Sequence, residues 1–96
     1  MTGDFDTIHN HHERAVFEAV HSHAAGHPHL KKDAELLADI ACVALNRLPP
    51  RYIRHEVDFA FYLTDKERSE NETAISEAVA FAFEFVQARV AMRARR

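Results

Sequence analysis

Residues 33–52 read DAELLADIACVALNRLPPRY, and this stretch decides most of the fold. Between Asp33 and Leu48 the apolar side chains recur at spacings of three and four residues, which predicts an amphipathic helix over residues 33–48. Asp33 suits the N-cap, where its carboxylate can accept a hydrogen bond from the first turn. Pro49 ends the helix because a residue before proline is pushed out of the α region. Pro50 keeps the next step extended, so a stiff corner follows the helix.

Two more helices are predicted on either side of this stretch. The first covers residues 8–25 and ends at Gly26 and Pro28. The last covers residues 65–93 and begins at Thr64, which has the capping-box spacing to Glu67. Its apolar surface is unusually wide for a helix packed on one side only. Between the corner and this helix, apolar and other residues alternate over 57–63, which predicts a β-strand.

The predicted strand at 57–63 needs a partner, because a lone strand leaves its backbone N–H and C=O groups unpaired. The other β-like stretch, residues 52–55, is too short to be a comfortable partner. The same strand from a second copy would satisfy both chains. The expected fold is therefore mostly α (α+β), with three helices and one short strand paired across a homodimer. Residues 1–96 are expected to form a single domain.

Composition narrows the functional classes. The net charge of -3 gives no general attraction to nucleic acid or to anionic lipid. With a single cysteine, Cys42, the chain can form no internal disulfide, and we expect Cys42 to lie in the core of its helix. No apolar run is long enough to span a bilayer and no signal peptide is apparent, so we expect a cytoplasmic protein without membrane insertion. No catalytic motif is found, and we expect no enzymatic activity.

The corner after the second helix carries the most distinctive chemistry. Arginine forks such as those of Arg47, Arg51 and Arg54 bind phosphate or the O6/N7 edge of guanine, and Tyr52 can stack on a base. The alternative is a helix stop with solvated arginines, in which Arg47 only balances the helix dipole. Spacing alone favours this second interpretation.

Histidines crowd the N-terminal third, but their spacing supplies no set of three ligands, so a polar helical face is favoured over a metal site and no cofactor is expected. These histidines are His9, His11, His12, His21, His23, His27 and His29.

The stretch from Asp39 to Tyr52, with its LN-x-LPP-x-Y block, resembles the late-competence ComFB family, and Asn10-x-x-Glu13 is similar to that family's first-helix pattern. The resemblance implies a dimeric bacterial receptor for cyclic dinucleotides, chiefly cyclic di-GMP, connected in some members with competence and pilus functions. Some members carry zinc-binding cysteines before the second helix; residues 27–35 contain none here, which makes a structural zinc doubtful. The ligand-binding residues expected from the corner and the resemblance together are Asn46, Arg47, Leu48, Pro49, Pro50, Arg51, Tyr52 and Arg54, with Asn10 and Glu13 in second rank.

Three functions remain open from the sequence. The first is a cyclic-dinucleotide receptor, for cyclic di-GMP or cyclic di-AMP, that regulates a downstream partner. The second is a ligand-independent adaptor whose PPRY corner docks on a protein. The third, which the net charge disfavours, is a small DNA-binding dimer that uses a basic tail formed by Arg89, Arg93, Arg95 and Arg96.

Overall fold

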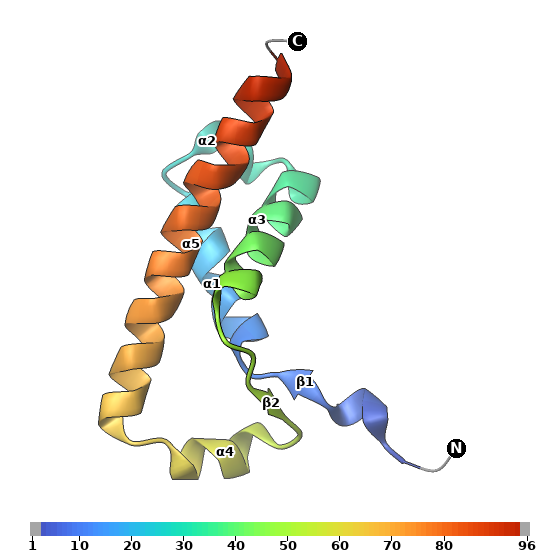
Figure 1. Ribbon diagram of the computed structural model, residues 1–96, viewed down its shortest axis with the longest axis vertical. Helices are drawn as coiled ribbons and strands as arrows, with labels where there is room; N and C mark the ends of the chain where they lie inside the picture. The colour runs from blue at the N-terminus through green and yellow to red at the C-terminus, as the bar shows by residue number, and fades with distance from the viewer. Residues whose placement is uncertain (1–2, 95–96) are drawn as a thin grey trace.

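A computed structural model describes residues 3–94, and it is mostly helical (Figure 1). Three helices pack together: α1 (His12–Ala24), α3 (Ala34–Arg47) and the long α5 (Asp65–Ala94). A single-turn helix, α2 (Pro28–Lys31), links α1 to α3. The remaining elements are a 3-10 turn (Phe5–Thr7), the strands β1 (His9–Asn10) and β2 (Tyr52–Ile53), and the helix α4 (Glu56–Tyr62).

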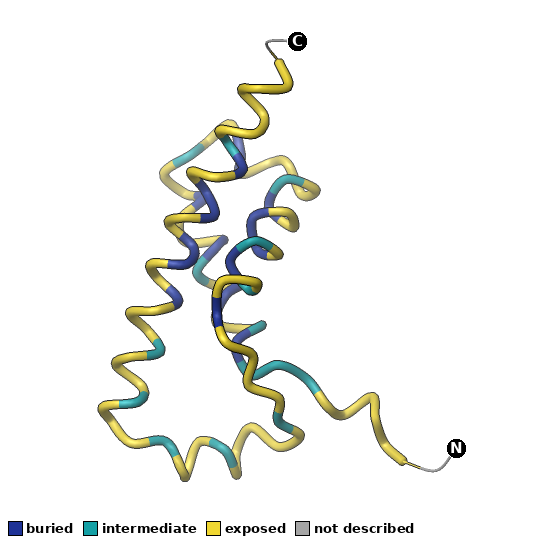
Figure 2. The backbone as a smooth tube through the Cα atoms, viewed as in Figure 1, coloured by how far each residue is buried: buried dark blue, intermediate teal, exposed yellow. Residues whose placement is uncertain are grey.

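The core lies where α1, α3 and α5 meet, and it contains the buried apolar stripe of each helix (Figure 2). This core includes Val16 and Val20 of α1, Ile40 of α3, and Phe83 of α5, whose side chain is almost fully enclosed. Burying a large apolar side chain stabilises a fold by about 1.5–3 kcal/mol. The other core residues, at the same helical spacings, are Ala24, Leu30, Leu37, Ala41, Ala44, Leu48, Ile75, Ala78, Val79, Ala82 and Val86.

The two helix starts predicted from capping residues are confirmed. Asp33 accepts a hydrogen bond from the Leu36 N–H at 3.0 Å, and Thr64 Oγ1 accepts one from the Glu67 N–H at 3.1 Å. The helix predicted over 33–48 is α3, and the one over 65–93 is α5. The helix predicted over 8–25 begins later, at His12, because residues 9–10 pair as a strand instead.

The strand predicted over 57–63 is wrong: these residues form α4. Within residues 3–94 this segment pairs with no strand, and a helix satisfies its backbone groups internally, as the Phe59 N–H does with the His55 carbonyl at 3.1 Å. Glu56 and Asp58 favour the helix because acidic side chains interact well with a helix N-terminus. The stretch 52–55 was expected to be too short to pair, yet two of its residues, Tyr52–Ile53, form the strand that pairs with β1.

Strands β1 and β2 form a two-stranded antiparallel sheet, with His9 opposite Ile53 and Asn10 opposite Tyr52. Together with α4 they form a region that we call the arm, at the foot of the molecule and at the opposite end from α2 (Figure 1). None of the α4 residues, all of which the structure describes, is buried. Phe61 and Tyr62 are 84% and 82% exposed. Neither side chain is therefore part of the core of the single chain.

Cys42 is also misplaced by the sequence prediction, because it is exposed. The buried face of α3 is set by Leu37, Ile40 and Ala44, and a residue two positions after Ile40 is turned about 200° around the helix. Helix α3 carries apolar residues on more than one side, so a broad stripe in the sequence overstates the width of its buried face.

Candidate functional site

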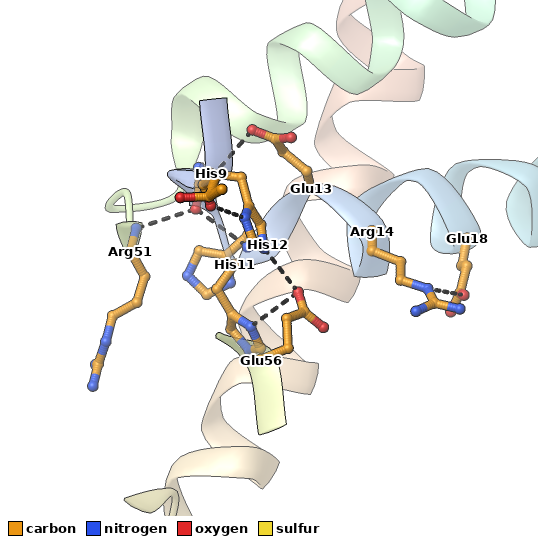
Figure 3. Close-up of polar contacts among 10 residues, drawn as sticks. His9, His11, His12, Glu13, Arg14, Glu18, Arg51 and Glu56 are labelled. Atoms are coloured by element: carbon orange, nitrogen blue, oxygen red, sulfur yellow. Dashed lines mark hydrogen bonds and ion pairs between the residues drawn. The ribbon is translucent and has the colours of Figure 1, made fainter. Parts of the chain in front are cut away.

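The LPPRY corner (Leu48–Tyr52) is anchored at both ends. Leu48 ends α3 and its side chain is buried in the core, while Pro49 and Pro50 are exposed. On the far side, the Arg51 N–H donates to Asn10 Oδ1 at 3.1 Å, and the Arg51 carbonyl accepts from the His11 N–H at 2.7 Å. Both backbone groups of Arg51 are thus fixed to the start of α1 (Figure 3).

Asn10 and Glu13 explain their own spacing once this anchor is seen. Asn10 Oδ1 also accepts from the His12 N–H at 3.2 Å, and Glu13 Oε2 accepts from the Asn10 N–H at 3.4 Å. These contacts pair N–H groups at the start of α1 that the helix itself leaves free. One oxygen atom of Asn10 therefore accepts both from the first residue of α1 and from the corner. Its contacts, and those of Glu13, are structural.

The three arginines in and beside the corner, Arg47, Arg51 and Arg54, contact three different elements. The Arg47 guanidinium carbon lies 3.7 Å from the ring centroid of Phe81 in α5. That of Arg51 lies 4.8 Å from the ring centroid of Phe59 in α4. Arg54 Nε donates to Thr7 Oγ1 at 2.9 Å. All three side chains belong to exposed residues, so each cation remains accessible to an anion in solvent.

The predicted ligand-binding residues thus divide into two groups. Tyr52, which follows Arg51 directly, is 68% exposed. Leu48 is part of the core, and Asn46 turns back on its own helix, where Nδ2 donates to the Cys42 carbonyl at 3.0 Å and to Cys42 Sγ at 3.7 Å. The exposed residues of the predicted set that do not bond back onto their own helix are Arg47, Pro49, Pro50, Arg51, Tyr52 and Arg54; Asn46 is exposed as well.

A histidine cluster lies next to the corner and links β1 to α4. Glu56 Oε1 lies 3.3 Å from His9 Nε2 and 3.9 Å from His11 Nδ1 (Figure 3). A hydrogen bond with the Thr7 carbonyl, followed by the contact with Glu56, raises the pKa of His9. Burial lowers the pKa of His12, with smaller effects from the nearby His11 and Arg51. The pKa values of His9 and His12 are therefore shifted in opposite directions.

Sequence reasoning missed Phe59, Phe81 and Glu56 as neighbours of the corner. Phe59 was assigned to a strand, and Phe81 to the surplus apolar surface of the last helix. Sequence spacing gives no signal for these contacts, because 8 residues separate Arg51 from Phe59 and 34 separate Arg47 from Phe81. In the described part of the chain no three His, Cys, Asp or Glu side chains converge as metal ligands, and no helix is long and apolar enough to cross a membrane.

A groove of about 680 Å³ runs between α1 and α3, away from the corner. Phe17 and Val20 form one wall, and Leu37, Cys42 and Leu45 form the other. Lys31 and Lys32 stand at its α2 end. The groove is mostly apolar, and it is open enough for a neighbouring molecule to cover.

Comparison with known proteins adds one positive finding. Residues 9–90 match the family model described as late competence development protein ComFB. The match extends from β1 to the last turns of α5, so it includes the anchor at Asn10, the LPPRY corner and the arm. Neither the curated proteins nor the solved structures yield a match.

Proposed function

Because this chain belongs to the late competence development protein ComFB family, we propose that it is a non-enzymatic receptor that binds a cyclic dinucleotide at the LPPRY corner. Family membership suggests a competence-related role. In the proposal, the ligand is cyclic di-GMP first and cyclic di-AMP second, and its binding regulates a downstream protein partner.

The observation that carries the proposal is the fixed frame under Arg51. Asn10 and His11 hold both of its backbone groups, and two prolines precede it, while its guanidinium remains exposed. Freezing a flexible arginine on binding costs free energy, and a frame fixed beforehand lowers that cost. A rigid segment that presents arginines and a tyrosine to solvent suits a rigid, anionic, aromatic ligand.

The ligand's chemistry matches the side chains offered. A cyclic dinucleotide carries two phosphates and two bases. A guanidinium can donate two parallel hydrogen bonds to a phosphate or to the O6/N7 edge of guanine, and the Tyr52 ring offers a stacking surface. Adenine presents a donor at N6 where guanine has O6, so an arginine fork favours guanine.

Calorimetric titration with cyclic di-GMP and cyclic di-AMP tests the proposal. Loss of one bidentate contact in Arg51→Ala should weaken binding by about tenfold to a hundredfold, equivalent to about 1.5–3 kcal/mol. Arg51→Lys should recover little, because lysine restores the charge without the fork. The matched control is Arg14→Ala, which removes an exposed arginine of α1 that pairs with Glu18.

We also propose that the chain works as a homodimer, supported now by exposed apolar side chains rather than by a shared strand. Phe61 and Tyr62 of α4 are exposed, as are Phe85 and Met92 of α5 and Phe17 beside the α1–α3 groove. A second copy that covered these surfaces would remove apolar area from water. Light scattering at micromolar concentration should give the mass of a dimer; the mass of a monomer would contradict this part of the proposal.

The ligand-independent adaptor is the second candidate, and the exposed face of α4 is the observation that favours it. A short helix carrying Val57, Phe61 and Tyr62 in solvent is suited to docking on another protein. If the wild type binds neither cyclic dinucleotide, the adaptor replaces the receptor. Binding to duplex DNA that falls steeply with added salt would instead support the DNA-binding alternative.

A further inference from the structure

Two phenylalanines outside the LPPRY corner contact arginines: Phe59 contacts Arg51 of the corner, and Phe81 contacts Arg47 at the end of α3. Phe59 lies in α4 and has the Arg51 guanidinium carbon 4.8 Å from its ring centroid. Phe81 lies in α5 and has the Arg47 guanidinium carbon 3.7 Å from its ring centroid. Arginines on both sides of the diproline are therefore paired with an aromatic ring supplied by a later element of the chain.

The geometry of such a pair matters for what the arginine can still do. A guanidinium is planar and its five N–H donors lie in that plane. When it stacks on a ring, the ring contacts its face, and the donors at its edges remain free for an anion. A stacked arginine is thus held in place without losing its hydrogen-bonding capacity. Exposed arginines elsewhere on the surface would have to be ordered by the ligand itself.

We propose that Phe59 and Phe81 are positioning residues of the ligand site, which hold the guanidiniums of Arg51 and Arg47 with their forks directed toward a bound anion. This inference rests on the proposed receptor function. It extends the site beyond the LPPRY corner to α4 and α5. It also predicts that α4 becomes more ordered when a ligand binds.

The response of α4 follows from how weakly it is held. None of its residues, all within the described chain, is buried, and Phe59 contacts the body of the protein through Arg51 and through His11, whose ring centroid lies 4.4 Å away. Further ties are Glu56 with His9 and His11, and the Arg68 side chain, which donates to the Ala60 carbonyl at 2.9 Å. A ligand that fixes Arg51 also fixes the partner of Phe59, so α4 should become more ordered.

Affinity for cyclic di-GMP is the first readout. Phe59→Leu and Phe81→Leu should each weaken binding by about twofold to fivefold, the size expected for an exposed cation–π pair. Phe59→Tyr keeps an aromatic face and should bind as the wild type does. Phe17→Leu is the matched control, since Phe17 is a partly exposed phenylalanine of α1 that lines the groove between α1 and α3. Thermal unfolding monitors whether each variant remains folded.

The second readout is the slowing of amide hydrogen exchange that the ligand causes in α4. If Phe59 had only a structural role, its substitution would not abolish this slowing. Cyclic di-GMP at saturation should slow exchange over residues 56–62 of the wild type, and this slowing should be lost in Phe59→Leu but kept in Phe17→Leu. If the wild type binds and both leucine variants bind equally well, this inference is overturned while the receptor proposal stands. If the wild type binds neither cyclic di-GMP nor cyclic di-AMP, the receptor proposal fails and takes this inference with it.

Discussion

The core and the arm of this protein are held together by different kinds of interaction. In the core, α1, α3 and α5 meet through buried apolar side chains such as Val16, Ile40 and Phe83. In the arm, short elements are tied by hydrogen bonds to Asn10, by the Glu56–His9 contact and by an arginine on an aromatic ring. Apolar packing provides the stability, whereas polar ties fix the shape of the proposed site.

This difference predicts that truncating an aromatic residue lowers the free energy of unfolding strongly in the core and only slightly in the arm. Phe83→Ala should lower the free energy of unfolding by about 3–5 kcal/mol, because it leaves a cavity among well-packed neighbours. Phe61→Ala in the arm should change it by less than about 0.5 kcal/mol in the isolated chain. Urea denaturation measures both. A large loss at Phe61 that depends on protein concentration would show instead that a second copy covers α4.

The same difference explains how much the sequence revealed. Helical periodicity reports burial on one face, so α3 and α5 were predicted from residues such as Leu37, Ile40 and Phe83. In α4, Val57, Phe59 and Phe61 alternate although none is buried, and the alternation suggested a strand that the chain does not form. Cys42 lies among apolar neighbours along α3 but on the opposite side from Ile40, and helix rotation relative to the core is a tertiary property.

The sequence singles out the residues of the proposed site, but it gives no indication of the contacts that hold them. The LPPRY corner and its arginines stand out locally, because prolines and arginines concentrate there. The anchoring role of Asn10 depends on a contact with Arg51, 41 residues later, and the contacts of Arg47 and Arg51 with aromatic rings depend on how α4 and α5 return to the corner. Such long-range contacts follow from the fold and leave no spacing in the sequence.

Asn10 offers the sharpest test of the polar ties. Asn10→Ala removes the acceptor for the N–H groups of Arg51 and His12, and the loss of these hydrogen bonds at a partly exposed site should cost about 0.5–1.5 kcal/mol of unfolding free energy. Binding of cyclic di-GMP should weaken too, since the frame of the corner is released. Asn10→Asp keeps an oxygen acceptor and serves as the control. Unchanged stability in Asn10→Ala would show that the prolines alone fix the corner.

Acid titration separates His12, at the start of α1, from His9, in β1. His12 is 8% exposed, and burial, with help from His11 and Arg51, lowers its pKa. Its neutral form is favoured in the folded state, so its contribution is present above its unfolded pKa of about 6.5 and is lost as the pH falls through the lower folded value. His12→Gln should therefore flatten the loss of stability between about pH 7 and pH 5, a slope of at most about 1.4 kcal/mol per pH unit.

His9 should act with the opposite sign. The contacts with Thr7 and Glu56 raise its pKa, so its contribution is complete below about pH 6.5 and is lost as the pH rises through the higher folded value. Because His9 lies at the surface, this effect should be the smaller of the two. Urea denaturation of His9→Gln and His12→Gln at several pH values checks both signs. Parallel curves for the two variants would contradict the opposite shifts.

Cys42 should give the smallest change in stability, and it tests the edge of the core directly. The residue is exposed on α3, two positions after the buried Ile40, so Cys42→Ser should alter the unfolding free energy by less than about 0.5 kcal/mol. Ile40→Ala, on the buried face, should cost about 2–5 kcal/mol. In the native protein the thiol should react readily with an aromatic disulfide reagent, because access rather than unfolding limits the reaction. Slow reaction at high protein concentration that becomes fast on dilution would place Cys42, which lines the groove between α1 and α3, beneath a second copy of the chain.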